Sequence, residues 1–195
     1  MTPLEILAED MRANGVNPDE ALCSNSKQKC SIKRVRTGTC LYSQHHIGEG
    51  WLFLTNGVAA SRQTHPDGGW SIARFFERGQ FCANLTSAWT KEYTPDDLVA
   101  ITDIEGVEFP DAFFREEFLR GGRLGEYIRL KSIETLCFDK EVICIKTIND
   151  TEARYRFLEE RHDSVVAKAL QKHIAAFLGI TPQGLSRFLK ARRGV

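Results

Sequence analysis

Apolar positions follow two different periods along the chain, and the change of period divides it. Residues 3–14 have the period of a helix that ends at Asn14-Gly15, and Asn17-Pro18 starts a second short helix. From about residue 31 to residue 109 the sequence changes to short β-rich runs, and Asn56-Gly57 and Asp67-Gly68 are strong hairpin signals. Eight such runs at regular spacing predict a barrel or jelly-roll rather than a βαβ sheet: residues 31–35, 39–42, 50–54, 58–63, 69–76, 80–82, 97–101 and 106–109.

Helical periodicity returns after Phe109-Pro110. Residues 111–119 predict a short helix, Gly121-Gly122 a joint, and a long helix starts at Arg123; residues 142–145 would also suit a strand. Apolar residues at steps of three and four form a continuous stripe, which favours a dimerisation helix over packing on the chain's own β domain. The stripe consists of Leu124, Tyr127, Ile128, Leu130, Ile133, Leu136 and Cys137, and we assign the dimer contact to Leu124, Tyr127, Ile128, Ile133 and Leu136.

Two short helices joined by a tight turn are predicted near the end of the chain, after a helix over residues 152–160 that residues 149–151 cap. Gly179 ends the first of the two, Thr181 caps the second, and Pro182 occupies its first helical position. This pattern is a helix-turn-helix, whose second helix is suited to a DNA major groove. That helix buries Leu185, Phe188 and Leu189 and presents Gln183, Gly184, Arg187 and Lys190 outward.

Charge is distributed unevenly although the formal net charge is zero. Residues 161–195 hold seven Lys or Arg against one acid, Asp163, which gives +6 there and −6 on the first 160 residues. A basic segment on an acidic body favours binding of a phosphate backbone by that segment, and the alternative is a solvated helix face. The chain has no run of 18 apolar residues and no charged-then-apolar leader, so we expect a soluble, cytoplasmic protein without a membrane partner.

The residues that could hold a metal do not form a convincing set. The six cysteines include no C-x-x-C pair, and a cluster on Cys23, Cys30, Cys40 and Cys82 would need closer spacing, so we expect reduced thiols. His45, His46 and Glu49 are similar to the metal motif of cupins, but neighbours on a strand point to opposite faces. No Ser-His-Asp triad, no pair of catalytic carboxylates and no Walker motif stands out in the sequence. We predict a protein that is not an enzyme and has no metal and no cofactor.

The order of these elements resembles the Crp/Fnr family of bacterial transcription regulators over nearly the whole chain. The resemblance is carried by residues 74–81, 99–103 and 152–161 and by Ile174-Ala-Ala-Phe-Leu-Gly-Ile-Thr-Pro-Gln-Gly-Leu-Ser-Arg187, which looks like the branch common in Bacteroidetes-type bacteria. It implies an α+β chain with a double-stranded β-helix sensor domain over 1–120, a dimerisation helix over 121–148 and a helix-turn-helix domain over 149–195. Only two residues follow Arg193, so the family's wing is expected to be short or absent.

The resemblance also implies a ligand pocket in the β-roll, where the family binds a cyclic nucleotide. The matching positions place Asn84 where a Glu holds the ribose and Thr94 where an Arg holds the phosphate. Lys91 could replace that cation only as a point charge. Two acids and no Arg make a poor phosphate site, so we do not expect cyclic AMP or cyclic GMP; another ligand, or support of the dimer alone, remain open. The pocket set is Phe81, Cys82, Ala83, Asn84, Leu85, Thr94, Asp96 and Asp97.

Matched to the family's recognition helix, Gln183 and Arg187 fall on the base-contacting positions. Gly184 leaves room for the groove floor, and Thr181, Ser186 and Lys190 would touch phosphates. The expected partners are double-stranded DNA and a second copy of the chain, with RNA polymerase as a further candidate. The alternative is an effector- or protein-binding β-roll module with vestigial DNA binding. The DNA-binding set is Thr181, Pro182, Gln183, Gly184, Ser186, Arg187 and Lys190.

Overall fold

The computed structural model describes residues 1–18, 30–45, 47 and 50–193. An N-terminal helix, eight strands and seven further helices occur in the described part of the chain, and the predicted helix that starts at Asn17-Pro18 falls mainly outside it. The elements are α1 (Pro3–Ala13), β1 (Ser31–Val35), β2 (Cys40–Tyr42), β3 (Gly50–Asn56), β4 (Ala59–Thr64), β5 (Trp70–Phe76), β6 (Phe81–Cys82), α4 (Leu85–Thr90), β7 (Asp96–Ala100), β8 (Ile104–Pro110), α5 (Asp111–Arg120), α6 (Arg123–Thr147), α7 (Thr151–Arg161), α8 (Asp163–Lys168), α9 (Gln171–Leu178) and α10 (Pro182–Arg192).

Two antiparallel four-stranded sheets form a β-roll, which confirms the predicted jelly-roll. One sheet has the order β1-β8-β3-β6 and the other the order β2-β7-β4-β5. Apolar side chains of both sheets meet between them, because successive strand residues point to opposite faces. This core cluster contains Leu52, Leu54, Ala59, Phe76, Cys82, Leu98, Ala100 and Ile104.

The two predicted hairpin turns have different outcomes. Asp67-Gly68 joins β4 to β5, which pair from Ala59↔Phe76 to Thr64↔Trp70, so this prediction is confirmed. Asn56 is the last residue of β3 and Gly57 follows it, but β3 and β4 belong to different sheets, so the hairpin prediction is wrong here. Gly57 has a φ of +90°, and a Cβ there would lie 2.3 Å from the Asp103 carbonyl oxygen. A left-handed glycine at a close approach therefore carries the chain from one sheet to the other.

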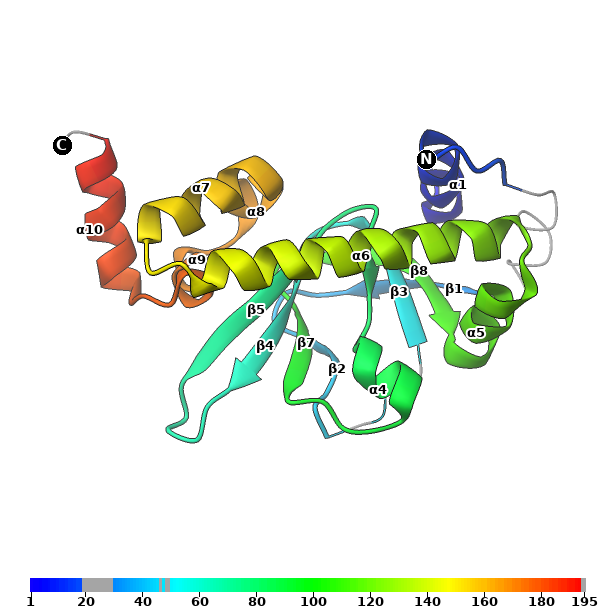
Figure 1. Ribbon diagram of the computed structural model, residues 1–195, viewed down its shortest axis with the longest axis horizontal. Coiled ribbons are helices and arrows are strands. Elements are labelled where there is room, and N and C mark those ends of the chain that lie inside the picture. Colours follow the sequence, from blue (N-terminus) through cyan, green and yellow to red (C-terminus); the bar gives the residue numbers. More distant parts are fainter. Residues whose placement is uncertain (19–29, 46, 48–49, 194–195) are drawn as a thin grey trace.

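The helix α6 runs along the length of the molecule above the β-roll (Figure 1). It is continuous through residues 142–145, so these residues are helical rather than extended. Its first turns pack on α1, α5 and the roll, where the Tyr127 ring meets the Phe53 ring edge at 6.2 Å and the Tyr127 hydroxyl donates to Asp10 at 2.5 Å. Leu124, Tyr127 and Ile128 are buried in that core, so their assignment to a dimer contact is wrong. Ile133 and Leu136 are exposed.

The C-terminal helices pack against the β2-β7-β4-β5 sheet and share one core with it. Phe75 and Phe177 lie 5.6 Å apart between ring centroids, and Lys146 Nζ donates to the Ile72 carbonyl oxygen at 2.5 Å. The expected boundaries at 120 and 148 coincide with the ends of α5 and α6 within one residue. The core nevertheless crosses the second boundary, so the roll and the C-terminal helices are mechanically joined. In the described residues, no helix is both long and apolar enough to cross a membrane.

Candidate functional site

The two helices near the C-terminus form the predicted helix-turn-helix. α9 ends at Gly179, whose φ of +73° is left-handed, and α10 begins after Thr181. The Thr181 side chain accepts a hydrogen bond from the Gly184 amide at 3.0 Å, which satisfies one of the free N–H groups of the first turn. Leu178 and Leu185 are completely buried between the helices. Local capping and burial thus fix the angle at which α10 leaves the turn.

The outer face of α10 carries the predicted DNA-contacting residues. Thr181, Pro182, Gln183, Arg187 and Lys190 are exposed. Gly184 and Ser186 are half-buried beside them. Figure 1 shows α10 at the end of the molecule, away from the β-roll. The structure therefore brings the set together on one accessible surface.

Ion pairs reduce the positive charge expected for the C-terminal segment. The Arg192 guanidinium binds Glu159 through its two terminal nitrogens at 2.6 and 2.7 Å and also contacts Glu152 at 3.1 Å. Arg161 binds both carboxylate oxygens of Glu141 at 2.7 Å. The count of +6 overestimates the charge offered to a polyanion, because two of its arginines face acids that lie before residue 161.

A cavity of about 460 Å³ lies between the β-roll and α6, at the place where the resemblance puts a ligand. Of the predicted pocket set it brings together Ala83, Asn84, Thr94 and Asp96. The others lie elsewhere: Phe81 and Cys82 are buried in the core clusters, Leu85 begins α4, and Asp97 binds Arg62 and the Gln44 amide, each at 3.0 Å. Asp96 and Asp97 separate because neighbours on a strand face opposite ways.

Polar groups of this cavity are bonded mainly to one another. Ser61 Oγ donates to Asp96 at 2.5 Å, and Asn84 Nδ2 and Thr94 Oγ1 each donate to the Asp96 carbonyl oxygen at 3.3 Å. Asn84 Oδ1 is buried without a partner. An unsatisfied buried acceptor on the wall marks a place where a ligand N–H or O–H could bind.

An ion pair that sequence reasoning missed closes the α6 side of the cavity. Arg74 of β5 binds Asp139 of α6, its guanidinium lies 4.2 Å from the Phe76 ring centroid, and its Nε is buried without a partner. Burial lowers the pKa of Arg74 and raises the pKa of Asp139, while the mutual attraction opposes both shifts. From the sequence alone, Asp139 could be identified only as an acidic residue on the side of α6 that also carries the buried Val142. Lys91 does not substitute as the cavity's cation, because it binds Asp111 at 2.7 Å.

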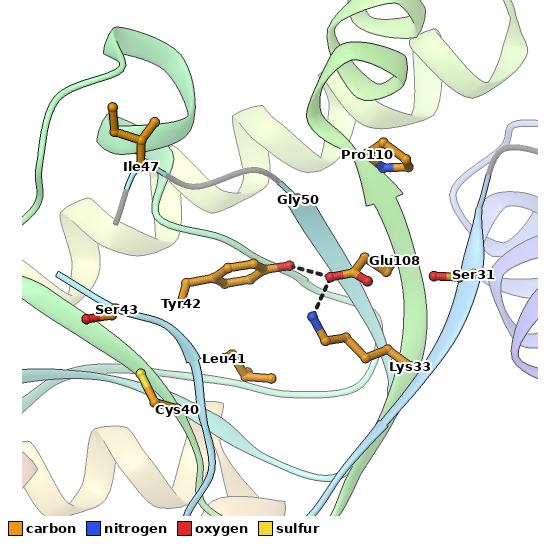
Figure 2. Close-up of a pocket in the computed structure, with 10 residues that line it drawn as sticks. All are labelled: Ser31, Lys33, Cys40, Leu41, Tyr42, Ser43, Ile47, Gly50, Glu108 and Pro110. Atoms are coloured by element: carbon orange, nitrogen blue, oxygen red, sulfur yellow. Dashed lines mark hydrogen bonds and ion pairs between the residues drawn. The ribbon is translucent and has the colours of Figure 1, made fainter. Parts of the chain in front are cut away.

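A second cavity, of about 600 Å³, lies between strands β1, β2, β3 and β8. Figure 2 shows Glu108 accepting from Lys33 Nζ at 2.5 Å and from the Tyr42 hydroxyl at 3.2 Å. Burial and the Glu108 charge raise the pKa of Tyr42, so the phenol stays protonated. These three groups are bonded to one another through a single carboxylate oxygen of Glu108.

The cupin-like motif gains no support from the described residues. His46 and Glu49 lie outside them, as does Cys23. Within the part of the chain that the structure describes, no three His, Cys, Asp or Glu side chains are grouped to hold a metal.

Comparison with known proteins agrees with this architecture. Residues 32–120 match the family model for the cyclic nucleotide-binding domain. FixK2 from Bradyrhizobium japonicum superposes with a TM-score of 0.70 at 15% identity, over 85% of this chain and 86% of that chain. The c-di-GMP responsive global regulator CLP from Xanthomonas campestris gives 0.67 at 13% identity, over 90% and 92%. The regulatory subunit of a cAMP-independent protein kinase A from Trypanosoma cruzi, bound to guanosine, gives 0.51 at 20% identity, over 66% and 42%. No curated protein sequence matches the chain.

The chain therefore consists of a β-roll with a cavity beside α6 and a C-terminal helical unit that contains the helix-turn-helix. Residues 32–120 match the cyclic nucleotide-binding domain, and the chain as a whole shares its fold with FixK2 and CLP, which are Crp/Fnr transcription regulators. The predicted resemblance is confirmed at this level, while the bacterial branch stays a prediction.

Proposed function

We propose that the chain is a dimeric, sequence-specific DNA-binding transcription regulator whose β-roll does not take a cyclic phosphate. The observation that carries this is the accessible face of α10, which holds Gln183 and Arg187 on a capped, well-anchored helix. Gln can bond adenine through two hydrogen bonds, and Arg can do the same with guanine. Lys190 at the end of that face suits a phosphate.

The exposed side of α6 supports a dimer. Ile133, Leu136 and Ile143 are 62%, 65% and 64% exposed, and Leu130 is exposed beside them. Large apolar residues gathered along one helix mark an interaction surface. Two-fold dimers of helix-turn-helix proteins bind paired half-sites, so a second copy of the chain is the fitting occupant.

The cavity supports a ligand without a phosphate. Arg74 is the only Lys or Arg among the residues that line it, and Asp139 already neutralises it. A phosphate would add negative charge beside Asp96 and Asp139 with no free cation to bind it. The unpaired Asn84 acceptor suits a neutral or cationic hydrogen-bond donor instead. The guanosine complex of the Trypanosoma cruzi subunit is an example of a nucleoside bound by a protein with this kind of domain.

Binding of the purified full chain to its own upstream DNA tests the proposal, by fluorescence anisotropy with a salt titration, with and without cyclic AMP. We expect steeply salt-dependent binding that cyclic AMP does not change. Arg187→Ala should cost about 1–3 kcal/mol of discrimination between cognate and random DNA, whereas Lys190→Ala should weaken both alike and reduce the salt slope by about 1. Arg36→Ala, at an exposed arginine of the β-roll, serves as the matched control.

An Arg187→Ala variant that keeps its full preference for cognate DNA contradicts the recognition assignment. Binding that appears only with cyclic AMP contradicts our interpretation of the cavity. A protein-binding module with vestigial DNA binding is the second candidate, and it is favoured by the acids that neutralise Arg192 beside α10. It predicts no DNA binding at any salt concentration, together with a stable complex with another protein.

A further inference from the structure

Two cysteines lie on the exposed side of α6, seven residues apart. Cys137 and Cys144 are both exposed, and seven residues bring a helix back to within about 20° of the same direction, about 10.5 Å further along. The other described cysteines differ in position: Cys82 is buried, which raises its pKa to about 12, Cys30 is half-buried, and Cys40 lies on β2. Two accessible thiols therefore share one face of one helix.

These thiols occupy a regular pattern of exposed positions, which we call the α6 seam. Its members follow steps of three, four, three, four and three, and this period of 3.5 is the spacing at which two helices can stay in contact along their length. The opposite side of α6 faces the chain's own roll through Asp139, Val142 and Lys146. The α6 seam consists of Leu130, Ile133, Cys137, Lys140, Cys144 and Thr147.

Exposed apolar residues beside the α6 seam fit a second copy of the same helix running parallel. Leu136 and Ile143, which lie next to the seam on one side of α6, are 65% and 64% exposed in the single chain. In a parallel two-fold pair, each seam residue faces its own counterpart, so Cys137 meets Cys137 and Cys144 meets Cys144. Such a pair covers the seam and the apolar residues beside it.

We propose that Cys137 and Cys144 each form a disulfide with the same cysteine of a second copy, which locks the dimer covalently under oxidising conditions. The inference rests on the proposed dimer. At an axial separation of about 10 Å and a Cα radius of about 2.3 Å, facing Cα atoms lie about 5.4 Å apart. That separation falls within the range of about 4.4–6.8 Å found for disulfides.

The oxidant is a peroxide or a small-molecule disulfide. With hydrogen peroxide, two thiols lose two protons and two electrons to form one S–S bond, the O–O bond breaks, and two water molecules are released. With a small disulfide, two successive thiolate exchanges give the same bond and release two small thiols. Both routes are reversed by an added thiol reductant.

A covalent lock on α6 would act on the regions that the helix touches. The turn that carries Ile143 lines the β-roll cavity, and the end of α6 leads into the helices that share a core with the roll. Linking two copies converts binding of the second half-site into an intramolecular event. We therefore expect the oxidised protein to hold paired half-sites at protein concentrations at which the reduced protein dissociates.

The test uses the full chain, reduced and then treated with hydrogen peroxide, and follows covalent dimer formation on non-reducing gels. Facing thiols have a millimolar effective concentration, so at micromolar protein we expect crosslinking on the order of 10²-fold faster than in the Cys137→Ser, Cys144→Ser double variant. Each single variant should still crosslink through the remaining pair. Cys40→Ser, at an exposed cysteine outside α6, should behave as the wild type.

Peptide mapping and light scattering decide between the outcomes. Cys137–Cys137 and Cys144–Cys144 links support the lock, whereas Cys137–Cys144 links overturn it because they require antiparallel helices. A reduced protein that is dimeric by light scattering but does not crosslink overturns the lock and leaves the proposed dimer in place. A reduced protein that is monomeric at all concentrations overturns both.

Discussion

A buried carboxylate holds the C-terminal helices against the β-roll, and its removal is the most informative stability test. Glu77, directly after β5, contacts His162 Nδ1 with one carboxylate oxygen and accepts from Ser164 Oγ with the other. His162 lies between α7 and α8, and its side chain is 1% exposed, while that of Glu77 is 15% exposed. The perturbation is Glu77→Ala, which leaves the buried His162 and the half-buried Ser164 without their acceptor.

The expected loss follows from the two hydrogen bonds. A hydrogen bond to a charged group contributes about 1.5–3 kcal/mol, and removal of one partner of a buried pair costs about 3–5 kcal/mol. We therefore expect Glu77→Ala to lower the free energy of unfolding by about 3–4 kcal/mol at neutral pH. Burial raises the pKa of Glu77, but the bonds from His162 and Ser164 outweigh it and hold the pKa below its usual value.

That direction sets the sign of the pH dependence. A carboxyl whose folded-state pKa is lowered contributes stability above its unfolded pKa of about 4.3, and this stability is lost as the pH falls through the lower folded value. The difference between wild type and Glu77→Ala should therefore be largest near neutral pH and shrink in acid.

Urea unfolding followed by circular dichroism measures the change, with Glu160→Ala as the matched control, because Glu160 is an exposed glutamate of α7. Hydrogen exchange adds a local measurement, since the amides of α8 should lose protection more than those of β3. A loss below about 1 kcal/mol, or one equal to that of the control, would refute the reasoning that this carboxylate joins the two parts.

Three further predictions concern single contacts. Burial, and then nearby cations, lower the pKa of His173 from 6.5 to about 4. As the pH falls from 6.5 to 4, the wild type should therefore lose about 1 kcal/mol of stability, a size limited by the half-buried position, whereas His173→Asn should not. Unfolding measured at both pH values checks this difference. Gly125→Ala places a Cβ 2.0 Å from a carbonyl oxygen of α5 and should cost about 1–3 kcal/mol in thermal unfolding, whereas Gly122→Ala, whose nearest contact is 3.8 Å, should cost little. Asp139→Asn leaves the Arg74 charge uncompensated and should lower stability by about 2 kcal/mol, while calorimetry should detect tighter binding of phosphate-bearing nucleotides.

The elements that were predicted well from the sequence are those whose ends are determined by residues close to them in the chain. Each strand run was bounded by turn residues, so all eight strands could be placed within a few residues. The turn between α9 and α10 depends on Gly179, Thr181 and Pro182 alone, and these residues act on their immediate neighbours. Neither prediction needed knowledge of what lies across the fold.

Predictions that depend on distant neighbours were less successful, for a physical reason. Helical periodicity shows that one face of α6 is apolar, but it does not show what covers that face. Leu124 and Ile128 meet the chain's own core, while Ile133 and Leu136, further along the helix, are mostly exposed in the single chain. The Arg74–Asp139 pair joins positions 65 residues apart, so no local pattern could reveal it.

The course of α6 also decides how a ligand could control the helix-turn-helix. Asp139 and Ile143 of α6 line the cavity, and Cys144 of the α6 seam is the next residue after Ile143. Lys146, two residues further on, donates to the Ile72 carbonyl oxygen of β5. A ligand that draws Arg74 away from Asp139 would change the same two turns of α6 that meet a second copy in the proposed dimer. Because an interface and a packed core have discrete arrangements, a small shift there would change the spacing of the two α10 helices of that dimer rather than be absorbed locally. The proposed control of DNA binding therefore requires no contact between the ligand and α10.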